Sequence, residues 1–262
     1  MLRRIARSVL PRPIRHALLN MYARMNPVPT AEGWDRHARF SRYAVGAGEG
    51  KRFGDQWTTP AALGAVGVTP EGFMDYLDET MIRPYFEPGG TVLEIGAGGG
   101  RLTAILLRSC DRVIAADTGA TMIRLLRERF GDNPRVEYMK LDGNGLTGIA
   151  DRSLDKVFSY DVFVHLMQWD IYQYLIEIRR VLKRGGRAIL HHANMFSELG
   201  WKEFVHAVPI NLNKHKKFDT FSAMTPEMMR GLVERAGLTV HAVREDIVPR
   251  DCVTIIESPR TA

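Results

Sequence analysis

The 262-residue chain is 45% hydrophobic and 25% charged, which indicates one folded domain with appendages and excludes fibrous and disordered proteins. Its two cysteines, Cys110 and Cys252, lie without metal-ligand spacing, so neither a disulfide framework nor a zinc site is predicted. The sequence lacks both an apolar run of about eighteen residues and the pattern of a signal peptide, so we expect a cytoplasmic protein.

The basic excess lies at the N-terminus. Residues 1–30 contain six arginines and no lysine, aspartate or glutamate, which equals the formal net charge of +6, so the rest of the chain is balanced. Residues 1–25 carry apolar side chains at helical spacing and are broken by Pro11 and Pro13, which predicts two short amphipathic helices. We expect the apolar stripe of this arm to pack on the domain or on a second subunit, because a stripe this short gives only marginal membrane affinity. A peripheral position at the inner membrane face is the alternative, since the arginines suit an anionic surface.

Residues 31–90 are predicted to form a helical cap, in which Thr69-Pro70-Glu71 starts a helix over residues 72–85. The main domain, residues 91–262, then alternates apolar runs with amphipathic segments. Helices are expected at about 101–109, 120–130 and 166–183, the last ending at Gly185-Gly186. The predicted strands are Thr91–Ile95, Val113–Asp117, Val136–Met139, Leu154–Ser159, Ala188–His192, Leu238–Val243 and Cys252–Glu257. This pattern predicts an α/β, Rossmann-like, doubly wound sheet of seven mostly parallel strands, with the last two runs forming an antiparallel hairpin.

A glycine-rich turn follows the first predicted strand: residues 94–100 read Glu-Ile-Gly-Ala-Gly-Gly-Gly. Glycines permit a sharp turn and close approach of a ligand, and the next helix offers free N–H groups, so a nucleotide or nucleoside site is implied. A dinucleotide fingerprint requires Gly or Ala at the sixth place from Gly96, where Arg101 stands. An NAD-dependent oxidoreductase is therefore disfavoured.

The turn, the acidic residue before it and the features that follow resemble the motifs of class I S-adenosylmethionine-dependent methyltransferases, from about residue 90 to 258. The later features are Asp117 after the second strand, Leu141–Asn144 after the third, Tyr160–His165 after the fourth and Leu182–Arg187 before the fifth. The resemblance implies S-adenosyl-L-methionine as cofactor and S-adenosyl-L-homocysteine as product. It assigns cofactor contacts to Glu94, Gly96, Ala97, Gly98, Asp117, Thr118, Met122, Asp142, Gly143, Tyr160 and Asp161. No metal is expected, because no carboxylate cluster at a strand end has metal-ligand spacing.

Histidines at the expected carboxyl edge of the sheet are candidate general bases for a hydroxyl acceptor. His165 follows the fourth strand, and His191 and His192 close the fifth. Neighbours along a strand point to opposite sides, so only one of the pair should face the pocket. We favour His192, which shares a face with Asn194. A role that only shapes the pocket is the alternative for each histidine.

Residues 196–223 form a long segment that is predicted to be a lid or acceptor pocket. Trp201, Lys214 and His215 are its candidate substrate contacts, and its basic cluster suits an anionic acceptor. A solvated charged face is the alternative.

Residues 188–194 and 250–254 resemble segments of bacterial methyltransferases of glycan and surface-polysaccharide pathways. The expected reaction is therefore O-methylation of a hydroxyl on a small molecule or glycan. N- or C-methylation of another metabolite and non-catalytic, regulatory cofactor binding are the alternatives. Nucleic acid is not an expected partner, because the body is neutral and residues 160–163 lack the Asn/Asp-Pro-Pro-Tyr motif of base amino methylation.

Overall fold

The computed structural model describes residues 66–69, 72–212 and 222–260. The predicted basic arm, most of the predicted cap, Lys214 and His215 lie outside these residues. Within the described part of the chain, no helix combines the length and the apolar character needed to cross a membrane.

A seven-stranded sheet forms the centre of the domain, with strand order β3-β2-β1-β4-β5-β7-β6. Strands β1 to β5 run parallel, and β7 pairs antiparallel with both β5 and β6. This arrangement confirms the predicted α/β fold and its C-terminal hairpin. The strands are β1 Thr91–Ile95, β2 Arg112–Asp117, β3 Val136–Lys140, β4 Leu154–Ser159, β5 Leu182–Ala193, β6 Thr239–Arg244 and β7 Asp251–Glu257.

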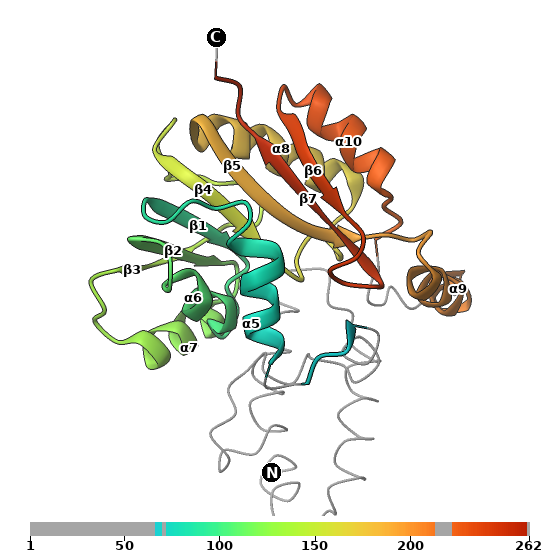
Figure 1. The fold of residues 1–262 in the computed structure, drawn as a ribbon, viewed down its shortest axis with the longest axis horizontal. Coiled ribbons are helices and arrows are strands. Elements are labelled where there is room, and N and C mark those ends of the chain that lie inside the picture. Colours follow the sequence, from blue (N-terminus) through green and yellow to red (C-terminus); the bar gives the residue numbers. More distant parts are fainter. Residues whose placement is uncertain (1–65, 70–71, 213–221, 261–262) are drawn as a thin grey trace, which may run out of the picture.

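Helices cover both faces of the sheet (Figure 1). Side chains of α5 and α6 pack with Val92, Val113 and Ile189 on one face, whereas those of α8 and α10 pack with Leu93 and Leu190 on the other. The helices are α5 Phe73–Leu77, the π-helical turn η2 Asp78–Ile82, α6 Arg101–Leu106, α7 Ala120–Phe130, α8 Gln168–Val181, α9 Glu198–Leu212 and α10 Pro226–Arg235.

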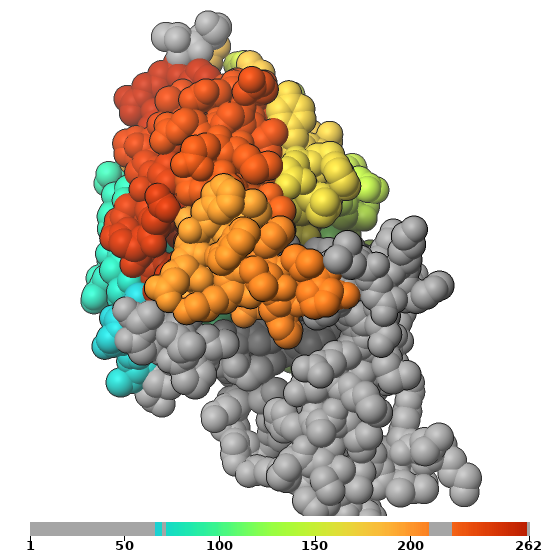
Figure 2. Space-filling model, turned by 90° about the vertical axis from the view of Figure 1, so that its right-hand side faces the viewer, coloured from blue at the N-terminus to red at the C-terminus, as the bar shows by residue number. Residues whose placement is uncertain are grey.

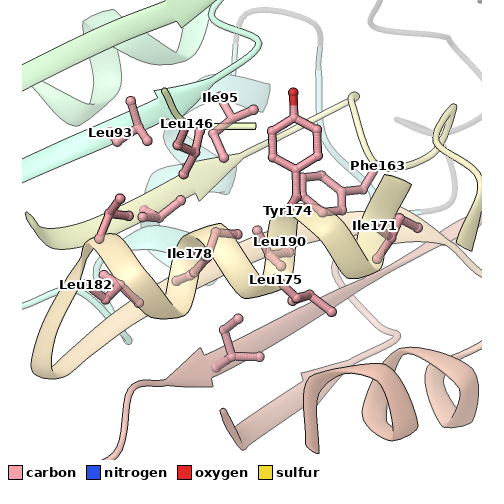
Figure 3. Close-up of a cluster of buried hydrophobic side chains, with 14 of the residues drawn as sticks. Leu93, Ile95, Leu146, Phe163, Ile171, Tyr174, Leu175, Ile178, Leu182 and Leu190 are labelled. Atoms are coloured by element: carbon pink, nitrogen blue, oxygen red, sulfur yellow. The ribbon is translucent and has the colours of Figure 1, made fainter. Parts of the chain in front are cut away.

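Helix α8 supplies much of the larger core (Figure 3). Its buried Ile171, Leu175 and Ile178 recur at helical spacing and face the sheet, where Leu190 of β5 meets them. Burying one such side chain contributes about 1.5–3 kcal/mol. This packing holds the loop between β4 and α8 against the carboxyl edge of the sheet.

Two elements differ from the sequence prediction. Strand β5 begins at Leu182, directly after α8, so Gly185-Gly186 belong to the strand and do not end the helix. At Gly186 a Cβ atom would lie 2.9 Å from the main-chain oxygen of Asp155, so only glycine permits this close pairing with β4. The segment predicted as a lid begins with a regular helix, α9, and Figure 2 shows it on the surface below α10.

Candidate functional site

The glycine turn after β1 adopts left-handed backbone conformations, with φ of 77° at Gly96 and 53° at Gly98. The N–H groups of Gly96 and Ala97 both donate to the carbonyl of Ala116, which anchors the turn to β2. A Cβ atom on Gly96 would lie 2.1 Å from a methyl group of Val162, whereas one on Gly98 would meet nothing within 4 Å. The turn therefore packs against the loop after β4 on one side and faces open space at Gly98.

Asp117, at the end of β2, joins the glycine turn to the next helix. One carboxylate oxygen accepts the N–H of Gly98 at 2.9 Å, and the other accepts the N–H of Gly119 at 2.8 Å. A carboxylate oxygen can accept more than one hydrogen bond, which suits a carboxylate at this position to the hydroxyl groups of a ribose.

Glu94 places a buried carboxyl group directly before the turn. Its side chain accepts a hydrogen bond from the hydroxyl of Thr103. Burial raises the pKa of Glu94 to about 8, and the nearby Asp117 adds to the rise, while the Thr103 bond opposes it. A cationic group placed beside this carboxyl would favour its ionised form.

Asp142 and Gly143 follow β3, as the sequence predicted. One oxygen of Asp142 accepts the N–H of Asn144 at 2.8 Å, so this carboxylate is an exposed turn acceptor. Gly143 has φ of 89°, and a Cβ atom there would lie 3.7 Å from the Thr118 methyl group, which places the loops after β2 and β3 beside each other. Met122 is buried in α7. The cofactor contacts of these residues remain predictions.

Asp161 lies just beyond β4 and has the left-handed backbone conformation, with φ of 59°. Its carboxylate is 3.4 Å from the guanidinium of Arg101, the first residue of α6, and its side chain is 27% exposed. Arg101 directly follows the glycine turn, and Val162 packs against Gly96. The loop that carries Asp161 is therefore adjacent to the turn. This partly open carboxylate is a candidate acid–base group beside the predicted cofactor site.

His191, near the end of β5, is hydrogen-bonded to the main chain of the loop that carries Asp161. Its Nδ1 accepts the main-chain N–H of Asp161 at 3.1 Å, and its Nε2 lies 3.2 Å from a carboxylate oxygen of Asp251. Tyr160 stacks on the imidazole with ring centroids 4.2 Å apart. Burial raises the pKa of Tyr160 well above its usual value, so this phenol stays neutral.

Asp251 begins β7 and stands between His191 and Arg250. Arg250 donates to both of its oxygens, at 3.0 and 2.7 Å. Burial acts to raise the pKa of Asp251, but His191 and Arg250 outweigh it and hold the pKa below its usual range. Asp251 therefore remains a carboxylate although it is almost fully buried.

His192 does not fit the general-base role that the sequence predicted. Its Nδ1 lies 2.9 Å from the carbonyl of Ala193 and its Nε2 lies 2.8 Å from the hydroxyl of Thr254, so both ring nitrogens are engaged within the sheet. Burial lowers its pKa to about 4. Asn194, which was expected to share its pocket, instead donates to Glu245 at 2.9 Å. Of the two neighbouring histidines, His191 is the one that reaches the loop after β4.

The other predicted acceptor residues are scattered. His165 lies in a turn before α8, where its N–H donates to the carbonyl of Val162 at 2.9 Å. Trp201 is 48% exposed on α9 and stacks on Phe204, with centroids 5.3 Å apart. Their substrate or catalytic roles remain predictions.

Sequence reasoning missed Asp251 and Arg250 as parts of this site and gave Arg101 no role in it. Asp251 comes beside β5 only through the antiparallel β5–β7 register, which pairs it with Ala193. Periodicity does not reveal that register. The one available signal was the alternation of side chains along β5, which places His191 and His192 on opposite faces of the sheet.

Comparison with known proteins agrees with this geometry. Residues 93–190 match the sequence model of a family described as a methyltransferase domain. A solved SAM-dependent methyltransferase from Methanosarcina mazei is similar, with a TM-score of 0.57 at 17% identity over 70% of this chain and 98% of that one. Another, from Mesorhizobium loti, has a TM-score of 0.50 at 13% identity over 65% of this chain and 91% of that one. Residues 93–190 therefore carry a methyltransferase domain, and the chain has the fold of class I S-adenosylmethionine-dependent methyltransferases, which supports S-adenosylmethionine as its cofactor.

Curated relatives correct one expectation about partners. Ribosomal RNA small subunit methyltransferase A of Geobacter metallireducens is 40% identical over 55 residues, which are 21% of this chain and 20% of that protein. An rRNA adenine N-6-methyltransferase of Streptomyces fradiae is 38% identical over 63 residues, 24% and 19% of the two chains. This chain spans less than half the length of these relatives. The expected exclusion of nucleic acid as a partner is wrong, because the relatives are named for methylation of ribosomal RNA.

Proposed function

We propose that the chain transfers a methyl group from S-adenosylmethionine to a hydroxyl group of its acceptor. The observation that supports this proposal best is the position of the Asp161 carboxylate. It lies beside the glycine turn, is partly exposed, and lies 3.4 Å from the guanidinium of Arg101 and 3.5 Å from Nδ1 of His191. A hydroxyl acceptor needs such a group, because its proton must leave as the new bond to carbon forms.

The residues of the glycine turn fit the cofactor. The space beside Gly98 admits a ligand at the main chain. The carboxylates of Asp117 and Asp142 are suited to the ribose hydroxyls and the adenine amino group, and Glu94 to the ammonium of the methionine end. Bound S-adenosylmethionine supplies an electrophilic methyl on a sulfonium, and when the acceptor oxygen bonds to that carbon, the breaking bond leaves its electron pair on sulfur.

Asp161 takes up the hydroxyl proton in this proposal. Arg101 stabilises the carboxylate by charge, at 3.4 Å, and the bond from the Asp161 N–H to His191 fixes the direction of the side chain. Most of the rate enhancement then comes from alignment of the acceptor with the methyl group, and proton removal contributes about two to four orders of magnitude.

A second candidate reaction is methylation of an amino group in ribosomal RNA. The name of the Streptomyces fradiae relative favours it. The hydroxyl proposal itself does not exclude RNA, since a ribose carries a hydroxyl at its 2′ position. The two reactions differ in the atom that becomes methylated.

Methyl transfer from S-adenosylmethionine labelled in its methyl group tests the proposal. The acceptor panel contains small alcohols, sugars, glycans and ribosomal RNA, and mass spectrometry of the product locates the methyl group. O-methylation of a panel member is the expected result. Label on an amino nitrogen favours the second candidate, and cofactor binding without transfer to any acceptor supports the non-catalytic alternative.

Asp161→Asn tests the carboxylate itself. Asparagine tolerates the left-handed backbone and keeps the shape of the side chain, so cofactor affinity is expected to stay within about threefold while kcat falls by about two to four orders of magnitude. Asp132→Asn, at an exposed position after α7, is the matched control and should leave both quantities unchanged. Wild-type kcat in Asp161→Asn would remove Asp161 from the reaction.

A further inference from the structure

A line of charged and polar side chains crosses the carboxyl edge of the sheet behind Asp161. It joins residues from α6, the β4 loop, β5 and β7, in the order Arg101, Asp161, His191, Asp251 and Arg250. His191 is fully buried and Asp251 is 1% exposed, whereas the side chains of Asp161 and Arg250 are 27% and 37% exposed. Asp161 is therefore the one carboxylate of the line that a substrate can reach.

The backbone of Asp161 needs a partner to hold its conformation. A non-glycine residue with φ of 59° costs about 1 kcal/mol or more relative to ordinary backbone. Its N–H finds an acceptor in Nδ1 of His191, at 3.1 Å, instead of in a main-chain carbonyl. The direction of the Asp161 carboxylate consequently depends on one side chain of the neighbouring strand.

The orientation of His191 is itself fixed. Because Nδ1 accepts a hydrogen bond, the ring carries its proton on Nε2, which lies 3.2 Å from the Asp251 carboxylate in an electrostatic contact without hydrogen-bond geometry. Stacking of Tyr160 against the ring, at an interplanar angle of 15°, holds the plane of the imidazole. Arg250 compensates the buried charge of Asp251 from the other side.

We propose that His191 and Asp251 are positioning residues, which hold Asp161 in its left-handed conformation and so aim its carboxylate at the acceptor. This inference rests on the proposed function, in which Asp161 receives the acceptor proton. His191 acts only through Asp161, by presenting Nδ1 as a fixed acceptor, and Asp251 selects the tautomer that makes Nδ1 available. A buried ion pair that only stabilises the fold is the alternative.

Two substitutions of His191 separate positioning from stability. In His191→Asn the amide oxygen lies near the former Nδ1 and can accept the Asp161 N–H, whereas in His191→Gln the amide reaches the former Nε2 and can donate to Asp251. Each variant keeps one of the two contacts and loses the other. We expect comparable losses of thermal stability, but kcat reduced by about a hundredfold in His191→Gln and by less than about fivefold in His191→Asn.

His192→Asn is the matched control, because His192 is equally buried on the opposite face of the same strand. It should lower the melting temperature and leave the kcat of the folded protein nearly unchanged. In an Asp161→Asn background, His191→Gln should cause no further loss of kcat, because the two residues act as one unit. Equal kcat in the two His191 variants, or additive losses in the double variant, would overturn the positioning role.

The tautomer of His191 provides a readout that does not depend on turnover. Long-range ¹⁵N–¹H spectra of the full chain should show His191 protonated on Nε2 alone, and Asp251→Asn should disturb that pattern. A proton on Nδ1 in the wild type contradicts the inference even if methyl transfer is observed. The expected tautomer with no transfer to any acceptor instead counts against the proposed reaction and leaves the hydrogen-bond geometry established.

Discussion

Gly98 is the residue at which the main chain is open to a ligand. Its φ of 53° means that alanine there costs about 1 kcal/mol, while the added methyl group meets no protein atom. We expect Gly98→Ala to fold and to bind S-adenosylhomocysteine about tenfold more weakly or worse, because the methyl group fills the space beside the cofactor. Isothermal titration calorimetry measures the affinity, and thermal unfolding measures the stability.

Two further glycines serve as controls. Gly148→Ala introduces strain of the same kind, with φ of 90° and no atom within 4 Å, at a loop position with no predicted cofactor contact, and should leave the affinity unchanged. Gly96→Ala, which forces a methyl group to 2.1 Å from a Val162 methyl, should destabilise the fold itself. The proposed cofactor position fails if Gly98→Ala and Gly148→Ala bind alike.

Glu94 predicts a pH dependence of cofactor binding. Because burial raises its pKa to about 8, this carboxyl is mostly protonated in the free protein at pH 6–7. The proposed contact with the cofactor's ammonium favours the ionised form, so binding releases a proton and the Kd should fall as the pH rises from 6 to 7.5. The cofactor's own α-amino group titrates near pH 8, above this window.

Glu94→Gln has no proton to release, so its Kd should be nearly independent of pH over the same window. Calorimetry in buffers of different ionisation enthalpy counts the protons directly. The same proton release in wild type and Glu94→Gln would show that another group is responsible.

At the scale of elements, the N-terminal cap of α10 contributes to stability independently of the candidate site. The hydroxyl of Thr225 accepts the N–H of Met228 at 3.2 Å, and the helix buries Met229 and Val233 against the sheet. Thr225→Ala should lower the free energy of unfolding by about 1 kcal/mol. Thr225→Ser keeps the capping hydroxyl and should keep most of this stabilisation. Urea unfolding monitored by circular dichroism measures the difference. An unchanged midpoint in Thr225→Ala would mean that packing alone positions this helix.

Elements with clear boundary signals could be predicted from the sequence. The apolar run of β1 ends at glycines, and α7 is bounded by Gly119 and Gly131, so their limits agree with the structure. The glycines at the start of β5 were instead interpreted as a helix end, because a sequence does not show that a neighbouring strand excludes a side chain. Helix α9 was not predicted, because residues 196–223 were interpreted as a long loop that forms a lid or acceptor pocket.

The candidate site was only partly predictable for a related reason. Glycines, acidic strand ends and their order are local features, so the turn and Asp117 could be identified from the sequence. The choice between His191 and His192 depends on which face of β5 the β4 loop covers. The role of Asp251 depends on the register of two strands that run in opposite directions. Both are properties of tertiary pairing.

At the scale of the molecule, one edge of the sheet collects the glycine turn and the carboxylates of the candidate site. Parallel strands bring their carboxyl ends together, which aligns the glycine turn, Asp117, Asp142 and Asp161 after β1 to β4. Strand β7 runs in the opposite direction, so its beginning, Asp251, reaches the same edge beside the end of β5. The antiparallel strand thus adds to the site an acidic residue, Asp251, that comes from the start of a strand and not from its end.

A ligand that joins these loops should stabilise the whole fold, because it binds residues held by four neighbouring strands and has no site in the unfolded chain. At about one hundred times its Kd, S-adenosylhomocysteine should add about 2.7 kcal/mol, which raises the melting temperature by roughly 5–10 °C for a domain of this size. NAD should give no comparable shift, since Arg101 occupies the helix-packing position of the dinucleotide fingerprint. Differential scanning calorimetry with each ligand measures both shifts, and Gly98→Ala at the same ligand concentration should lose most of the first. Equal shifts from the two ligands would contradict a turn shaped for a sulfonium nucleoside, because a nonspecific ligand gains nothing from the order of these loops.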